Sequence, residues 1–390
     1  MTKLALYTSS NPELQLILDV CRTRLRGNVL LSNSPDLKSF RWEKFVKLAE
    51  QHKIFPAVYT GIKSSLLEVP PTILVDMKSK YDQKVLRSMQ LTQNLALISE
   101  AFKKNTLDFY ILKGPFLSYQ LYGNFTSRQF SDLDLFVEPD HFQSAVAVLS
   151  SLGYKGGEFY NQMNSIQKRY YMNHFSDYSM RSPITNILVE LHWKIFPKKL
   201  INSDFEETIF QESLSLTIGE QVIKGMKLTN HLFYLTIHGY KHSWYRLSWL
   251  WDVANAFQLI NQDEQKELFK MAVSQKLEVP VIQSICLCNS IMGTNIQTEL
   301  KKHIKASILH FAEKSIETGK QTWTFSHMIK NYFYLAKMKR SLSYKISILM
   351  PYLTHFRDWK VIRLPAILFP VYFILRPFIL IYRRISKICT

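Results

Sequence analysis

The sequence is poor in the residues that mark several classes of protein. Its 390 residues include only 12 glycines and 14 prolines, which excludes collagen-like and low-complexity chains. The four cysteines form no CxxC pair, so they give neither a disulfide framework nor a typical zinc site. The first residues contain no apolar run long enough for a signal peptide. We therefore expect a globular protein of the reducing cytoplasm.

Acidic residues are also scarce relative to basic ones. The chain has 49 Lys and Arg but only 31 Asp and Glu, a formal net charge of +18. Twelve of the basic residues, against the single acid Asp358, lie in residues 321–390. An excess of this size predicts an anionic partner, such as nucleotide phosphates, nucleic acid or an acidic membrane surface.

The pattern of apolar residues predicts an α+β fold between helical regions. Three- and four-residue spacing from about Pro71 to Lys104 indicates a long helix, whereas the short apolar runs after Leu107 favour strands. Beyond Leu228 the spacing is helical again. We expect four parts: a helical N-terminal region (1–105), an α+β core of four or five strands (106–200), a helical C-terminal domain (201–320) and a basic, apolar tail (321–390).

Two aspartates alternate with apolar residues in a predicted strand. Leu133, Leu135 and Val137 would face the core, which places Asp132 and Asp134 together on the opposite face. Two adjacent carboxylates repel each other unless cations neutralise them, and Mg²⁺ prefers such oxygen ligands. A pair of solvated acids on a sheet face would have the same pattern.

A second predicted strand carries a third carboxylate. Glu190 and His192 share one face of the run around residues 187–193, while the apolar residues between them share the other. A carboxylate next to an aspartate pair is what a two-metal phosphoryl or nucleotidyl transfer site needs. Glu190 could instead form an ion pair with a nearby base, and for His192 we expect a structural hydrogen bond.

Four residues near the aspartates could bind phosphate. Lys113 and Gly114 end the preceding strand, where a glycine lets backbone approach phosphate and the lysine adds positive charge. Arg128 could pair with the aspartates or bind a triphosphate. We also assign Ser131, directly before Asp132, to the nucleotide-binding set. A plain turn at Lys113 and an exposed loop arginine at Arg128 are the alternatives.

Five short motifs follow one another between residues 110 and 195: Leu-Lys-Gly, Leu-Tyr-Gly, Arg-Gln-Phe-Ser-Asp-Leu-Asp-Leu-Phe-Val, Leu-Gly-Tyr and Val-Glu-Leu-His-Trp. Together they resemble the uncharacterised bacterial nucleotidyltransferases of the DNA polymerase β-like superfamily, and the resemblance covers roughly residues 15–290. It implies a small mixed sheet whose Asp132, Asp134 and Glu190 bind divalent metal. Pro115 departs from the Gly-Ser or Gly-Gly of many superfamily members and removes a backbone donor.

A histidine pair in the C-terminal region is also part of this resemblance. His238 and His242 are four residues apart, so one helix face could present both. The HExxH zinc motif lacks its glutamate here, and no third ligand is evident. The resemblance implies nucleotide contact by Lys241 or His242, whereas packing of the histidines between helices is the alternative.

The resemblance implies a nucleotidyltransferase that moves a nucleoside monophosphate from an NTP to an acceptor and releases pyrophosphate, with Mg²⁺ or Mn²⁺ as cofactor. The acceptor, a protein, a sugar or a lipid-linked molecule, is not defined by the sequence. Two alternatives remain: an inactive protein of the same fold that binds a nucleotide or a partner, and an RNA-directed nucleotidyltransferase. No RNA-binding motif supports the latter.

The tail combines apolar and basic residues. Arg376 and three prolines interrupt the apolar stretch 364–382, which argues against a simple transmembrane span. Arg363 precedes this stretch, and Arg383, Arg384 and Lys387 follow it. This composition is compatible with peripheral contact of residues 360–390 with an anionic membrane, and equally with a terminal helix packed on the protein.

Overall fold

A computed structural model describes five stretches of the chain. They are residues 6–28, 40–196, 199–300, 304–320 and 325–386. Lys387, which belongs to the predicted basic tail, lies outside the described residues.

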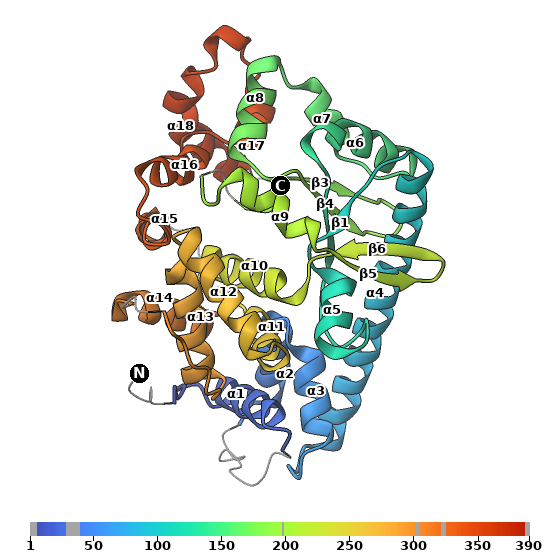
Figure 1. The fold of residues 1–390 in the computed structure, drawn as a ribbon, viewed down its shortest axis with the longest axis vertical. Coiled ribbons are helices and arrows are strands. Elements are labelled where there is room, and N and C mark those ends of the chain that lie inside the picture. Colours follow the sequence, from blue (N-terminus) through green and yellow to red (C-terminus); the bar gives the residue numbers. More distant parts are fainter. Residues whose placement is uncertain (1–5, 29–39, 197–198, 301–303, 321–324, 387–390) are drawn as a thin grey trace.

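The N-terminal region is helical, as predicted. It consists of α1 (Pro12–Leu25), α2 (Trp42–Gln51), α3 (Phe55–Lys63) and α4 (Pro71–Lys104). The long helix α4 begins with a proline. The fixed φ of proline suits the first turn, where a backbone N–H would have no partner within the helix in any case. Helix α4 runs along one side of the sheet (Figure 1). The expected bounds of this helix are therefore confirmed.

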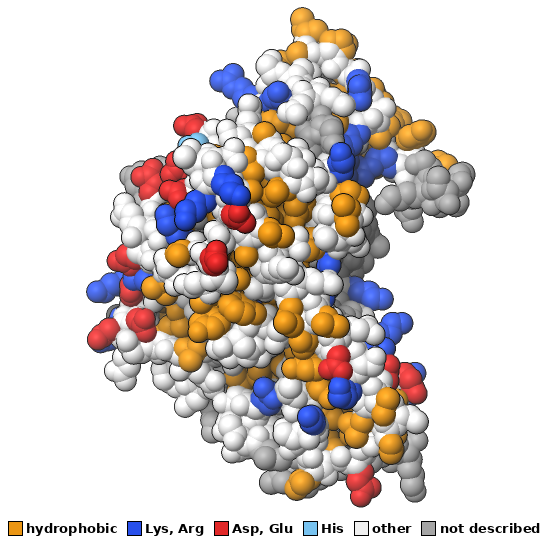
Figure 2. All heavy atoms as spheres, turned by 90° about the vertical axis from the view of Figure 1, so that its right-hand side faces the viewer, with side chains coloured by type: hydrophobic (Ala, Val, Ile, Leu, Met, Phe, Trp, Pro, Cys, Tyr) orange, Lys and Arg blue, Asp and Glu red, His pale blue; other side chains and the backbone are white. Residues whose placement is uncertain are grey.

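Helix α4 buries one face and exposes the other. Leu91, Leu95 and Ile98 recur at helical spacing and pack in the core beneath the sheet. The opposite side carries exposed apolar residues, including Leu86 and Met89. Figure 2, which turns the α4 side of the molecule toward the viewer, shows apolar side chains gathered on that face between scattered charges.

One mixed sheet forms the centre of the α+β part. Its strands are β1 (Tyr110–Ile111), β2 (Asp132–Phe136), β3 (Asp177–Arg181), β4 (Leu188–His192), β5 (Leu214–Ile218) and β6 (Gln221–Gly225), in the order β3-β4-β2-β1-β6-β5. The pairs β2–β4 and β1–β6 are parallel, and the other pairs are antiparallel. The α+β class is confirmed.

The sheet has six strands, whereas the sequence predicted four or five. The four expected strands are β1 to β4, and the additional pair is the hairpin β5–β6, which lies beyond residue 200. This hairpin joins the sheet through β6, which pairs with β1. The sheet is therefore completed by residues from the expected helical C-terminal domain.

Helices connect and cover the strands. Between the strands lie α5 (Gly114–Tyr122), the 3₁₀ turn η1 (Pro139–His141), α6 (Phe142–Ser151), α7 (Gly157–Gln162), α8 (Ser165–His174) and α9 (Ser203–Gln211). Leu133 and Leu135 of β2 are fully buried in the same cluster as apolar residues of α4 and α6. The acidic residues of β2 consequently face the other side of the sheet.

The C-terminal region is helical, as predicted, and its first part forms a second core. It contains α10 (Leu228–Lys241), α11 (Leu247–Leu259), α12 (Gln262–Ser274), α13 (Glu278–Ile291) and α14 (Ala306–Thr318). Helix α10 packs on α11, α12 and α13, and it shares its core with α1, α2 and α3. The N-terminal helices and the helices that follow the sheet thus form one helical unit beside the sheet (Figure 1).

The tail packs on the protein through one side. It comprises α15 (Phe325–Leu335), α16 (Leu342–Leu353), α17 (Phe356–Val361), the 3₁₀ turn η2 (Ala366–Leu368) and α18 (Val371–Ser386). Arg376 forms an ion pair with the buried Asp358, which satisfies the charge that interrupts the apolar stretch. Among the described residues, none of the helices has the length and apolar character needed to cross a bilayer.

Candidate functional site

The acidic residues of β2 and β4 meet on one face of the sheet. The two strands are parallel, and Asp134 lies opposite Glu190 in the register. Because side chains alternate along a strand, Asp132 shares the face of Asp134, and His192 shares the face of Glu190. Parallel pairing of two distant segments therefore brings together three carboxylates and an imidazole.

Asp134 is the centre of this group. Its Oδ1 lies 3.2 Å from Nε2 of His192 and 3.1 Å from Nζ of Lys113. Nε2 of His192 is also 3.9 Å from Oε2 of Glu190. The structural hydrogen bond expected for His192 is present, and its acceptor is the carboxylate of Asp134.

The cluster has the composition of a divalent cation site. Ligand atoms of Asp134, Glu190 and His192 all lie within 4.8 Å of one another. Carboxylate oxygens suit Mg²⁺, and a mixed oxygen and imidazole set is also acceptable to Mn²⁺. Asp132 is not part of this three-residue group. From the sequence, Asp132 was predicted to be a metal ligand and His192 was not, although the alternation in β4 already placed His192 on the same face as Glu190.

The pKa values in the cluster diverge. Burial alone would raise the pKa of Asp134, but the ammonium of Lys113 and the hydrogen bond from His192 hold it below its usual value. Burial, followed by the charge of Asp134, raises the pKa of Asp132. Burial and the neighbouring aspartates raise the pKa of Glu190 to about 7. One carboxylate thus stays ionised while another holds a proton near neutral pH, a pattern typical of functional sites.

Lys113 and Gly114 are positioned by the end of β1. The N–H of Leu112 donates to the carbonyl of Asp134, which places Lys113 next to that residue. Burial opposes the charge of the Lys113 ammonium, but Asp134 outweighs it and raises the pKa of Lys113. Gly114 has φ +63°, a left-handed conformation that favours glycine, and it opens α5. Pro115 follows and offers no N–H, so the helix start has fewer donors for an anion.

An aromatic wall lies beside Lys113; it consists of Tyr234 and His238 of α10, His242 directly after α10, and Trp249 of α11. The Lys113 ammonium lies 6.0 Å from the ring centroid of Tyr234. The rings of His238 and His242 are 4.7 Å apart, and both also contact the indole of Trp249. Burial, with nearby cations, lowers the pKa of both histidines, so they are neutral at physiological pH. The sequence analysis had not singled out Tyr234.

Lys241 and His242 have different surroundings. His242 is half-buried in the aromatic wall, whereas Lys241 is exposed at the end of α10. Within the part of the chain that the structure describes, the Lys241 side chain forms no hydrogen bond or ion pair. The predicted nucleotide contact is therefore compatible with the position of His242, and the structure gives Lys241 no partner in the acidic cluster.

Arg128 pairs with a residue that the sequence did not assign to it. Its Nε donates to Oδ2 of Asp252 at 2.8 Å, and the hydroxyl of Tyr122 donates to Oδ1 of the same carboxylate at 2.8 Å. Both charged groups are buried, and a buried guanidinium needs a counter-charge. Of the alternatives for Arg128, an ion pair with the β2 aspartates is replaced by one with Asp252, and an exposed loop position is contradicted by its burial. Ser131 is exposed at the start of β2.

Two solved structures are similar to parts of this chain. One, described as the antibiotic-resistance factor ANT(2'')-Ia, is 11% identical, with a TM-score of 0.33 over 50% of this chain and 97% of its own. The other, an antigenic nucleotidyltransferase-like protein from Paracoccidioides brasiliensis, is 15% identical, with a TM-score of 0.31 over 52% and 97%. No curated protein matches the chain.

A family profile gives a broader match. It covers residues 38–293, about two thirds of the chain, and includes every residue discussed above for the cluster, the phosphate-binding positions and the aromatic wall. The match extends from the N-terminal helices through the sheet to α13. The chain therefore belongs to the family of uncharacterised nucleotidyltransferases.

Proposed function

We propose that this chain transfers a nucleoside monophosphate from an NTP to the hydroxyl of an acceptor and releases pyrophosphate. The observation that carries the proposal is the convergence of Asp132, Asp134 and Glu190 on one sheet face, with Asp134 and Glu190 in register on parallel strands. Membership of the nucleotidyltransferase family supports the same reaction class.

The residues of the acidic cluster have different roles in this reaction. The acceptor oxygen forms a bond to the α-phosphorus, and the bond from the α-phosphorus to the bridging oxygen of pyrophosphate breaks. The proton of the acceptor hydroxyl passes to the carboxylate of Glu190, which lies opposite Asp134 on the neighbouring strand. The ionised Asp134 stays charged throughout, because Lys113 and His192 stabilise it.

A divalent cation fits the same residues. Asp134, Glu190 and His192 would hold it directly, with Asp132 nearby as the third carboxylate. When bound, Mg²⁺ or Mn²⁺ would neutralise phosphate charge and orient the reacting groups.

Nucleotide binding is assigned to the residues around this cluster. Lys113 and Gly114 lie beside Asp134 and would contact phosphates, and Ser131 lies next to Asp132 in the chain. His242 would contact the nucleoside from the aromatic wall, with Lys241 at its edge. Arg128 gives its Nε–H to Asp252, so we assign it to positioning the segment that leads into β2.

The test is transfer of label from each NTP to components of a cell extract, with Mg²⁺ or Mn²⁺ present. The Asp132→Asn plus Asp134→Asn variant should abolish labelling while the protein remains folded. A matched control replaces the exposed acids Glu138 and Asp140 by their amides and should label as the wild type does. Undiminished labelling by the β2 variant would refute the site.

The same assay separates the two alternative functions. A protein that only binds nucleotide would show Mg²⁺-dependent NTP binding without label in any acceptor. An RNA-directed enzyme would label RNA, and its RNA binding would weaken steeply as salt is raised.

The tail supports a proposal about location. Ile374, Phe378, Ile381 and Ile385 are exposed along one face of α18, at spacings of four, three and four residues. The tail region also carries the strong basic excess of the sequence. We propose that this face rests on an anionic membrane surface. Sedimentation with phosphatidylserine vesicles, but not with phosphatidylcholine vesicles, would support this contact, and equal recovery with both would refute it.

A further inference from the structure

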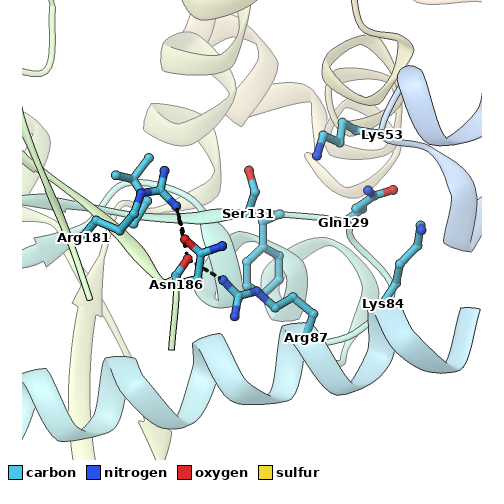
Figure 3. Close-up of a pocket in the computed structure, with 9 residues that line it drawn as sticks. Lys53, Lys84, Arg87, Gln129, Ser131, Arg181 and Asn186 are labelled. Atoms are coloured by element: carbon cyan, nitrogen blue, oxygen red, sulfur yellow. Dashed lines mark hydrogen bonds between the residues drawn. The ribbon is translucent and has the colours of Figure 1, made fainter. Parts of the chain in front are cut away.

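A basic cavity adjoins the acidic cluster but is separate from it. Its volume is about 290 Å³, and its lining includes Lys53, Lys84, Arg87 and Arg181, together with Gln129 and Ser131. Figure 3 shows Lys84 and Arg87 extending from α4, and Lys53 approaching from the loop between α2 and α3. Segments that are far apart in the sequence therefore contribute four cations to one small space.

Positive charge in this cavity exceeds the negative charge that could balance it. Among the residues that the structure places, no acid lines the cavity. Of the four lining cations, Lys84 alone forms an ion pair with an acid of the described chain, with its Nζ 2.5 Å from Oε1 of Glu50. Within the described residues, the Lys53 ammonium has no ion pair. Burial, followed by the charge of the nearby Arg246, lowers the pKa of Lys53, although Asp132 and Glu50 act in the opposite direction.

The two arginines are held in place by backbone carbonyls instead of acids. The Nη atoms of Arg87 donate to the carbonyls of Thr185 and Asn186, both at 2.9 Å. Nη1 of Arg181 donates to the carbonyl and the side-chain oxygen of Asn186. These contacts fix both guanidinium groups at the turn between β3 and β4 and leave their charges uncompensated. Fixed guanidinium groups are suited to bidentate binding of phosphate.

A polar atom in the lining also lacks a partner. Oε1 of Gln129 is buried and accepts no hydrogen bond from any residue that the structure describes. A buried acceptor of this kind is costly unless a donor reaches it. Because protein atoms enclose this oxygen, it belongs to the wall behind the cavity, and the cations alone indicate the chemistry of a ligand.

The cavity lies at the Asp132 end of the catalytic face. Ser131 precedes Asp132, and Leu188, another lining residue, is the register partner of Asp132 on β4. Lys113 and Gly114, to which we assign the NTP phosphates, do not line the cavity, and Ser131 lies where the nucleotide site and the cavity adjoin. A molecule bound in the cavity would therefore reach the reacting centre from a different direction than the nucleotide.

We propose that this basic cavity binds the phosphate group of the acceptor, and that the acceptor is a small phosphate monoester with a free hydroxyl. This inference rests on the proposed nucleotidyl transfer. A small molecule is favoured over nucleic acid because the cations converge on one cavity of about 290 Å³, whereas nucleic-acid-binding proteins spread them along a face or helix.

The first test measures binding of inorganic phosphate by calorimetry at constant ionic strength. Lys53→Gln removes a cation that has no ion pair to lose, so this variant should fold normally and bind phosphate at least fivefold more weakly. Arg87→Gln plus Arg181→Gln should weaken binding at least tenfold. The control, Arg169→Gln plus Arg340→Gln, removes two exposed arginines and should bind within twofold of the wild type.

Affinity for the Mg²⁺–NTP complex, measured on the same proteins, shows whether the cavity binds the phosphate of the acceptor or the triphosphate of the nucleotide. It should change by less than twofold in every variant, and inorganic phosphate should not compete with NTP. A parallel loss of NTP affinity would show that the cavity holds the triphosphate and would overturn the assignment. Equal phosphate binding by all variants would also overturn it.

The second test addresses the acceptor itself. The small-molecule fraction of a cell extract should accept label, and treatment of that fraction with phosphatase, followed by removal of the phosphatase, should abolish acceptance. Label in RNA or protein, or acceptance that survives phosphatase, would refute a phosphate monoester. If the wild type binds phosphate as described but never binds NTP, the transfer proposal fails while the anion site stands.

Discussion

Replacement of Glu190 by glutamine tests the electrostatics of the acidic cluster directly. In an unfolded chain this carboxyl has a pKa of 4.5, whereas burial and the neighbouring acids raise it to about 7 in the folded protein. The folded state therefore retains a proton that the unfolded chain has already lost. As a result, the free energy of unfolding falls as the pH rises from 4.5 through 7.

The size of this effect follows from the two pKa values. The full difference corresponds to about 3.4 kcal/mol, and about 2 kcal/mol of it develops between pH 5.5 and pH 8.5. Glutamine carries no charge at any pH, so Glu190→Gln removes this contribution. Relative to the wild type, the variant should become more stable by about 2 kcal/mol on going from pH 5.5 to pH 8.5.

Urea unfolding with a metal chelator present, at both pH values, measures the difference. Glu138→Gln replaces an exposed acid near the end of β2 and should leave the pH dependence unchanged. Addition of Mn²⁺ at pH 8.5 should stabilise the wild type more than Glu190→Gln, because a bound cation neutralises the carboxylate. A difference between the wild type and Glu190→Gln that does not vary with pH would refute the reasoning.

Three further substitutions test the residues that support the site. Lys113→Met leaves the buried Asp134 without its ammonium partner and should lower the free energy of unfolding by about 3 kcal/mol in urea titrations. Arg128→Met should cost a similar ~3 kcal/mol, and most of that loss should be recovered when Asp252 is also replaced by Asn, which a double-mutant cycle would show. Gly114→Ala should lower the free energy of unfolding by about 1 kcal/mol because Gly114 has a positive φ. The added carbon itself has room, because its nearest neighbours lie 3.8 Å away. An unchanged temperature of thermal unfolding would contradict this prediction.

The helices and the acidic strand were predictable because their signals are local. Helix α4 has a proline at its start and apolar residues at helical spacing over its length, and both signals are independent of the rest of the chain. The alternation around Asp132 and Glu190 likewise predicted which side chains share a face within each strand. These local patterns are enough to predict that acidic side chains gather on one face of each strand.

The features that the sequence did not predict depend on contacts between distant segments. Arg128 and Asp252 are 124 residues apart, and nothing near either of them indicates the pair. The cations of the basic cavity come from the loop between α2 and α3, from α4 and from the end of β3. Parallel pairing of β2 with β4 also has no local signature, because such strands are joined by a long connection.

The hairpin β5–β6 did leave a local signal. Leu214, Leu216 and Ile218 alternate with polar residues, and Gly219 and Glu220 separate them from the next strand. Two short alternating runs with a two-residue turn that contains glycine are typical of a β-hairpin. Only their attachment to β1 required the structure.

The most direct test of nucleotidyl transfer compares an NTP labelled at the α-phosphate with one labelled at the γ-phosphate. The account predicts α-label in the acceptor and γ-label in pyrophosphate, with both lost in the Asp132→Asn plus Asp134→Asn variant. Transfer of the γ-label to the acceptor, or transfer that survives the loss of both aspartates, would contradict it.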